Sequence, residues 1–113
     1  MNYKRAMIIE DEVDICILLS GFLEKNSFIT SYSTTIQEGL VKIIDFKPEI
    51  LFLDNNLPDG SGIEILPEIK KTFPNLKIIV ISALSNMKEI ALFNGANGFL
   101  SKPISFAHLS EYL

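Results

Sequence analysis

Two short apolar runs of the chain each end in acidic residues, and these acids are the side chains best suited to chemistry. Residues 50–53 are apolar and stop at Asp54, and residues 6–9 are apolar and stop at Glu10 and Asp11. An apolar run of four is long enough for a buried strand and too short for a helix. In a parallel sheet both strands would end at the same edge, where such folds bind their ligands, so we expect the three carboxylates to meet there.

Two other polar side chains follow later apolar strands. Ser82 ends the strand expected over residues 77–82, and Lys102 follows the strand expected over residues 98–101. At the same edge, a hydroxyl and an ammonium would join the three carboxylates. The alternative for Asp54 alone is that it only caps a turn, since the residues that follow it are rich in turn formers.

The combined set suits the binding of a metal ion and a phosphoryl group. Carboxylates held close together repel one another, which raises their pKa values unless a cation neutralises them. Mg²⁺ prefers oxygen ligands, and Asn56 could offer its backbone carbonyl to the same ion. A carboxylate beside Mg²⁺ and a lysine can act as the nucleophile towards phosphorus. Ser82 and Lys102 could then bind the oxygens of a phosphorylated Asp54.

The elements needed to position these residues are visible as an alternation of strand and helix patterns. Strands are expected over residues 5–9, 28–32, 50–53, 77–82 and 98–101. Helices are expected from Asp14, after a cap at Thr34 or Thr35, over residues 63–73 and 86–94, and after a cap at Ser105. Five such alternations predict an α/β fold with a doubly wound, five-stranded parallel sheet and helices on both faces.

Apolar residues at helical spacing predict which side of each helix is buried. On the first helix the predicted face is Ile15, Leu18, Leu19, Phe22 and Leu23, and on the second it is Ile36, Leu40, Val41, Ile43 and Ile44. Pro67 is tolerated only near the start of a helix, so we expect the third helix to begin late and to be shortened.

Composition narrows the class of protein. The chain has 113 residues, of which 48% are hydrophobic and 21% charged, which predicts one folded domain over residues 1–113. Its net charge of −4 argues against a direct electrostatic grip on nucleic acid. The apolar runs are too short to cross a membrane and no signal peptide is visible, so we expect a cytoplasmic protein. A single cysteine excludes an internal disulfide.

Several motifs, in this order, resemble the receiver domain of bacterial two-component response regulators, and the single-domain chemotaxis type in particular. They are Ile9-Glu10-Asp11-Glu12, Asp54 to Gly62, Ser82-Ala83, Gly95 to Phe99, and Lys102-Pro103. The resemblance implies a flavodoxin-like (βα)5 fold. It also implies a signalling protein rather than an enzyme, which takes its phosphoryl group from a histidine kinase or a histidine phosphotransfer protein.

The resemblance also implies a role for each residue of the site. Asp54 resembles the phosphoacceptor and Lys102 the phosphate-binding lysine. For Mg²⁺, Asp11 resembles the direct ligand, Asn56 the ligand through its backbone carbonyl, and Glu10 the acid that acts on the ion through water. Ser82 resembles the switch hydroxyl, Phe99 the switch aromatic, and Pro103 the proline that often follows a cis bond. A downstream protein would dock on the face formed by the fourth helix, fifth strand and fifth helix, and a homodimer is an alternative use of that face.

Departures from the family pattern keep a second interpretation open. Phe99 stands where the family often has tyrosine, the interval from Ser82 to Lys102 is short, and the last helix stops by Leu113, which predicts shortened fourth and fifth helices. The alternative is therefore a receiver-fold interaction module that is not regulated by phosphorylation. We expect a stand-alone relay or regulator; the excised receiver of a larger regulator or hybrid kinase is the other option.

Overall fold

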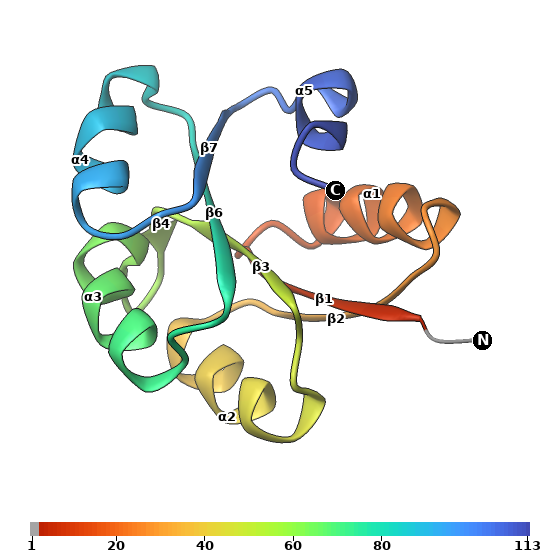
Figure 1. Cartoon of the computed structure of the whole chain (residues 1–113). Helices are drawn as coiled ribbons and strands as arrows, with labels where there is room; N and C mark the ends of the chain where they lie inside the picture. Colours follow the sequence, from red (N-terminus) through yellow and green to blue (C-terminus); the bar gives the residue numbers. More distant parts are fainter. Residues whose placement is uncertain (1–2) are drawn as a thin grey trace.

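The structure is a computed structural model that describes residues 3–113, and its centre is a five-stranded parallel sheet. The strands lie in the order β2-β1-β3-β6-β7 (Figure 1). Their bounds are β1 Lys4–Ile9, β2 Phe28–Ser33, β3 Ile50–Asp54, β6 Lys77–Ser82 and β7 Gly98–Ser101. This arrangement confirms the predicted doubly wound fold.

Helices cover both faces of the sheet. On one face lie α1 (Val13–Lys25) and α5 (Phe106–Ser110); on the other lie α2 (Ile36–Phe46), α3 (Gly62–Thr72) and α4 (Lys88–Phe93), the last preceded by the 3-10 turn η1 (Ser85–Met87) (Figure 1). The fourth and fifth helices are short, as predicted, with six and five residues. The fourth begins at Lys88 rather than at the expected residue 86, because the residues before it form η1. Within residues 3–113, none of the helices is long and apolar enough to cross a membrane.

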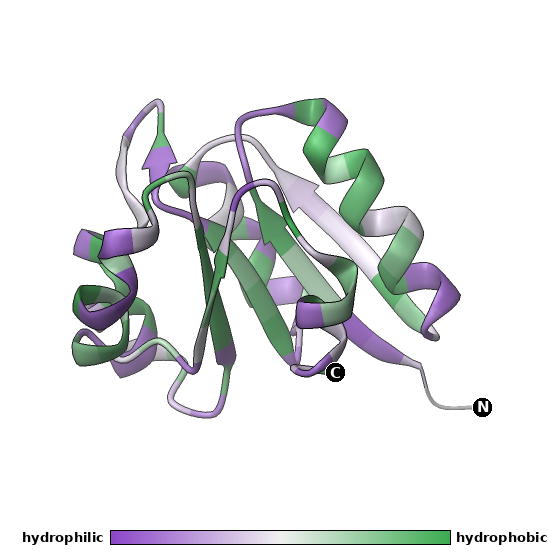
Figure 2. Ribbon diagram, turned by 90° about the horizontal axis from the view of Figure 1, so that it is seen from above, coloured by the Kyte–Doolittle hydropathy of each residue, from purple (hydrophilic) through white to green (hydrophobic). Residues whose placement is uncertain are grey.

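The sheet separates two apolar cores, and its central strands contribute to both. Met7, Leu51 and Val80 face α2, α3 and α4, whereas Phe52 and Ile79 face α1 and α5. Successive strand residues point to opposite faces, so a strand covered on both sides must be apolar throughout. Figure 2 shows this as hydrophobic colour concentrated on the strands in the middle of the molecule. The rigid sheet therefore fixes the positions of its carboxyl ends.

The predicted buried faces of α1 and α2 are wrong in part. Leu18 is 58% exposed, and Val41 and Ile44 are 65% and 60% exposed. In α1 the buried positions include Cys16 instead, so the helix is turned slightly from the predicted orientation. In α2 the backbone at Gly39 lies so close to Ile9 that any Cβ there would overlap its side chain. This close approach turns the flank with Val41 and Ile44 towards solvent.

The third helix does not start late, which corrects the prediction made from Pro67. It begins at Gly62 and runs through Pro67 to Thr72. Pro67 has no N–H to donate to the preceding turn, so one helical hydrogen bond is missing. Caps compensate at the start of the helix, where Ser61 Oγ accepts from the Glu64 amide at 3.4 Å and Asn55 Oδ1 accepts from the Ile63 amide at 3.1 Å.

A small hairpin between β3 and α3 was not predicted. Its strands are β4 (Asn56–Leu57) and β5 (Gly60–Ser61), which pair antiparallel. Leu57 is buried in the core shared with α2 and α3 and anchors this hairpin. The turn residues that follow Asp54 therefore form an ordered structure rather than an open loop.

Candidate functional site

Glu10, Asp11 and Asp54 meet at the carboxyl edge of the sheet. Glu10 and Asp11 follow β1, Asp54 ends β3, and these two strands are hydrogen-bonded neighbours. Each residue offers a carboxylate oxygen, and the three oxygens lie within 4.8 Å of one another. Glu10 and Asp54 are buried, and Asp11 is exposed. The cluster can hold a metal ion and is open to solvent on the side of Asp11.

Lys102 brings a positive charge to this cluster from the loop after β7. Its Nζ lies 2.8 Å from Glu10 Oε1 and 3.4 Å from Asp54 Oδ2. Burial alone would lower the pKa of Lys102, but the two carboxylates outweigh burial and raise it, so the side chain is an ammonium. The Lys102 amide donates to the Ser82 carbonyl at 2.9 Å, and the bond between Lys102 and Pro103 is cis.

The surroundings of Glu10 raise the pKa of its carboxyl group. Burial, together with the neighbouring Asp54 and Asp11, raises the pKa of Glu10 to about 7, although the contact with Lys102 acts in the opposite direction. Its Oε2 accepts the Glu12 amide at 3.1 Å. One lysine therefore does not neutralise three carboxylates, and an all-oxygen donor set with surplus negative charge fits a hard dication such as Mg²⁺.

Asn56 and Ser82 lie beside Asp54. The Asn56 amide donates to Asp54 Oδ1 at 3.3 Å, which places this residue next to the acid. Ser82 ends β6, one residue beyond Ile81, the partner of Asp54 in the sheet. Its hydroxyl is buried and accepts from the Leu84 amide at 3.0 Å, which leaves its proton free to be donated elsewhere.

Phe99 is not at the rim with the other predicted residues. It is 3% exposed and packs in the core on the side of α2, α3 and α4. Its amide donates to the hydroxyl of Tyr112 at 3.1 Å. The sequence did not predict this contact of Tyr112. It also did not predict that Asp59 caps α2, and the only local signal at Asp59 is its place in a Pro-Asp-Gly turn.

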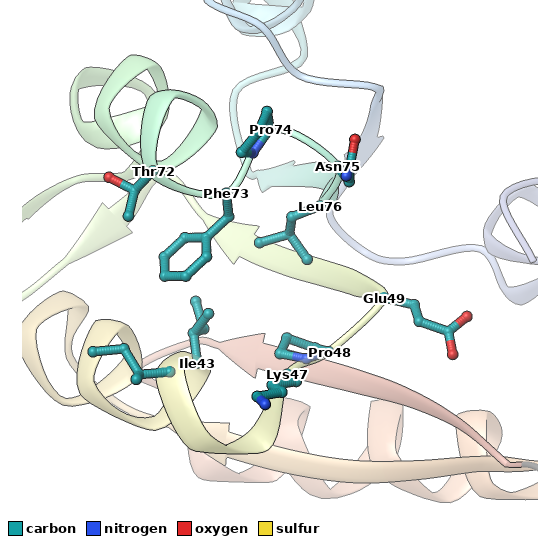
Figure 3. Close-up of a pocket in the computed structure, with 10 residues that line it drawn as sticks. Ile43, Lys47, Pro48, Glu49, Thr72, Phe73, Pro74, Asn75 and Leu76 are labelled. Atoms are coloured by element: carbon teal, nitrogen blue, oxygen red, sulfur yellow. The ribbon is translucent and has the colours of Figure 1, made fainter.

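A separate cleft of about 730 Å³ lies between the carboxyl ends of α2 and α3 (Figure 3). It is lined by Ile43, Ile44, Lys47, Pro48, Glu49, Thr72, Phe73, Pro74, Asn75 and Leu76. Glu49 and Leu76 immediately precede β3 and β6, so the cleft lies at the amino end of the sheet. The acidic cluster lies at the opposite end, and the two sites are distinct.

The fold and this acidic, lysine-bearing rim define a class of protein that comparisons with known sequences identify. Residues 6–113 match the model of the response regulator receiver domain. The chemotaxis protein CheY of Thermotoga maritima is 31% identical over 113 residues, which cover 97% of this chain and 94% of CheY. The chain belongs to the response regulator receiver domain family.

Other relatives place this domain in different settings. The transcriptional regulatory protein KdpE of Escherichia coli is 35% identical, but the chain spans only 48% of its length. Among solved structures, a CheY-like receiver domain protein from Methanospirillum hungatei has a TM-score of 0.89 at 27% identity. The match covers 98% of this chain and 90% of that protein. The receiver domain of NtrX from Brucella abortus has a TM-score of 0.87 at 32% identity, with 95% and 92% covered.

Membership of this family makes the chain a protein of two-component signal transduction. Receiver domains are non-enzymatic phosphoacceptor modules of two-component signal transduction, and the chain is of this kind. The cluster of Glu10, Asp11 and Asp54 is consistent with the phosphorylation site of such a module.

Proposed function

We propose that Asp54 accepts a phosphoryl group from the phosphohistidine of a histidine kinase or a histidine phosphotransfer protein. The observation that supports this most strongly is the contact of Lys102 with both Glu10 and Asp54 inside a cluster of three acids. A nucleophilic carboxylate, a place for a dication and a fixed ammonium are the parts that phosphoryl transfer requires.

In the transfer step, a carboxylate oxygen of Asp54 attacks phosphorus. The new P–O bond forms as the P–N bond to the donor imidazole breaks. The electron pair of that bond stays on the imidazole nitrogen, which takes up a proton from solvent. Lys102, 3.4 Å from Asp54 Oδ2, then pairs with the phosphoryl oxygens, and the Ser82 hydroxyl donates its free proton to one of them. These contacts favour the charge that develops on the transferred group.

The residues present would hold Mg²⁺ through the carboxylates of Asp11 and Asp54 and the backbone carbonyl of Asn56, with Glu10 acting through water. When bound, such an ion would neutralise part of the negative charge of the carboxylates and of the phosphoryl group.

Phosphorylation would switch the docking of a downstream protein, or of a second copy of the chain, on the face of α4, β7 and α5. Ser82 contacts the phosphoryl group in this proposal, and Phe99 repacks in response. Three apolar side chains of α4 support a docking role, since Ile90, Leu92 and Phe93 are 48%, 42% and 91% exposed. If Phe93→Ser leaves both self-association and partner binding unchanged, this surface is not the docking face.

Phosphorylation itself is tested with phosphoramidate and Mg²⁺, followed by intact-mass spectrometry of the wild type and Asp54→Asn. The wild type should gain one phosphoryl group, lose it with hydroxylamine, and fail to gain it without Mg²⁺. The variant should gain none. A wild type that is never modified would instead support a receiver-fold interaction module that is not regulated by phosphorylation.

A further inference from the structure

We propose that Asp59 is a positioning residue for the phosphorylation site. Its carboxylate ties the hairpin after Asp54 to the start of α2. This tie would keep the Asn56 carbonyl in place as a ligand for the metal ion. This inference rests on the proposed function, because it concerns the same Mg²⁺ site.

The tie consists of two hydrogen bonds between segments far apart in the sequence. Asp59 Oδ1 accepts from the Ile36 amide at 2.9 Å, and Oδ2 accepts from the Gln37 amide at 3.0 Å. These amides belong to the first turn of α2, where N–H groups lack helical partners and a negative charge is favourable. Both bonds favour the ionised form and lower the pKa of Asp59.

The rest of the hairpin also rests on the start of α2. Leu57 and Ile36 are buried in the same core cluster. Gly60 has a φ of +150°, and a Cβ at this position would lie 3.3 Å from Ile36 Cδ1. A side chain at position 60 would therefore be both strained and crowded, which preserves the close approach that Asp59 needs.

The base of the hairpin is fixed independently of Asp59. Asn55 Oδ1 accepts from the Ser61 hydroxyl at 2.8 Å and from the Ile63 amide at 3.1 Å. The base is thus held to α3, and Asp59 is the polar contact that holds the tip to α2. Asn56 lies between these two attachments, so the direction of its carbonyl depends on both.

A matched control exists because α2 has a second, local cap. Thr35 Oγ accepts from the Glu38 amide at 3.2 Å and, within residues 3–113, makes no hydrogen bond to the hairpin. Loss of either cap should weaken the start of α2. Only loss of Asp59 should also release the hairpin tip, which separates a positioning role from a purely structural one.

The test measures Mg²⁺ affinity by amide NMR titration, and stability by urea unfolding, for wild type, Asp59→Ala, Asp59→Asn and Thr35→Ala. We expect both Asp59 variants to bind Mg²⁺ about tenfold more weakly, the scale of lost outer-shell support. Thr35→Ala should lose stability but keep wild-type affinity. In the wild type, Mg²⁺ should also slow hydrogen exchange at the Ile36 and Gln37 amides, because coupling between two sites is reciprocal.

Each outcome has a defined meaning. Wild-type Mg²⁺ affinity in both Asp59 variants would overturn the positioning role, and so would an equal loss of affinity in Thr35→Ala. If the wild type itself bound neither Mg²⁺ nor a phosphoryl group, the proposed function would fail first. The Asp59→Asn variant retains the side-chain volume, so the comparison does not depend on the alanine variant alone.

Discussion

The ammonium of Lys102 lies 2.8 Å from Glu10 Oε1, closer than its 3.4 Å approach to Asp54. Glu10 therefore holds the lysine beside Asp54 while leaving Asp54 less tightly paired. An acid that was tightly paired with Lys102 would be a poorer nucleophile and a poorer metal ligand. In the proposed function, this arrangement would keep the lysine near the Asp54 oxygen that receives the phosphoryl group.

Replacement of Lys102 should have opposite effects on the two ligands of the site. Lys102→Met removes a cation from the acidic cluster, so we expect Mg²⁺ to bind more tightly, by about two- to tenfold for a charge at this range in a partly solvated site. The same variant should lose most of its affinity for beryllofluoride, a mimic of the phosphoryl group. Both are measured by NMR titration, and weaker Mg²⁺ binding would contradict the account.

The Asp59 cap predicts how the free energy of unfolding changes with pH. Because its pKa is lower in the folded state than in the unfolded chain, the cap contributes stability above the ordinary aspartate pKa. This contribution is lost as the pH falls through the lowered folded pKa. The free energy of unfolding of wild type and Asp59→Asn should therefore differ at neutral pH and converge in acid; a constant difference would contradict the assignment.

Tyr112 should stabilise the edge of the sheet. Its hydroxyl accepts from the Phe99 amide at 3.1 Å, and its ring lies so close to Gly98 that a Cβ there would overlap it. We expect Tyr112→Phe to lower the free energy of unfolding by about 1 kcal/mol, the usual net value of one hydrogen bond. Tyr3→Phe, at a position 49% exposed, is the control and should change little.

Leu84 should set how fast the acyl phosphate is hydrolysed. It is 59% exposed and lines the same depression as Asn56 and Ser82. An apolar side chain there cannot orient water, whereas a carboxylate can. Leu84→Glu should therefore lose its phosphoryl group several-fold faster than the wild type, and Leu84→Met should not. Equal decay of all three proteins, followed by intact mass, would remove Leu84 from the account.

The sheet and the meeting of Glu10, Asp11, Asp54 and Lys102 could be predicted because they follow from one geometric fact. Parallel strands end at a common edge, so polar residues that follow apolar runs are brought together there. Local caps such as Ser105, which accepts from the His108 amide, were also predictable because cap and amide are three residues apart.

The features that the sequence predicted wrongly, or did not predict, also have physical causes. Leu18, Val41 and Ile44 are apolar residues on helices that carry apolar side chains on more than one side, so periodicity alone could not choose the buried face. Asp59 caps a helix 22 residues earlier in the chain, and a contact between such distant segments leaves no local pattern. Pro67 was misjudged because the caps before it keep the first turn of α3 in place.

The most direct test of the central claim, that Asp54 is a Mg²⁺-dependent phosphoacceptor with a route to the α4 face, is a beryllofluoride titration with Mg²⁺. Amide NMR would follow the wild type and Asp54→Asn. We predict shifts around Asp54, Ser82, Phe99 and α4 in the wild type, and none of these beryllofluoride-dependent shifts in the variant. No binding by the wild type would contradict the claim, and shifts confined to Asp54 and Ser82 would contradict the route to α4.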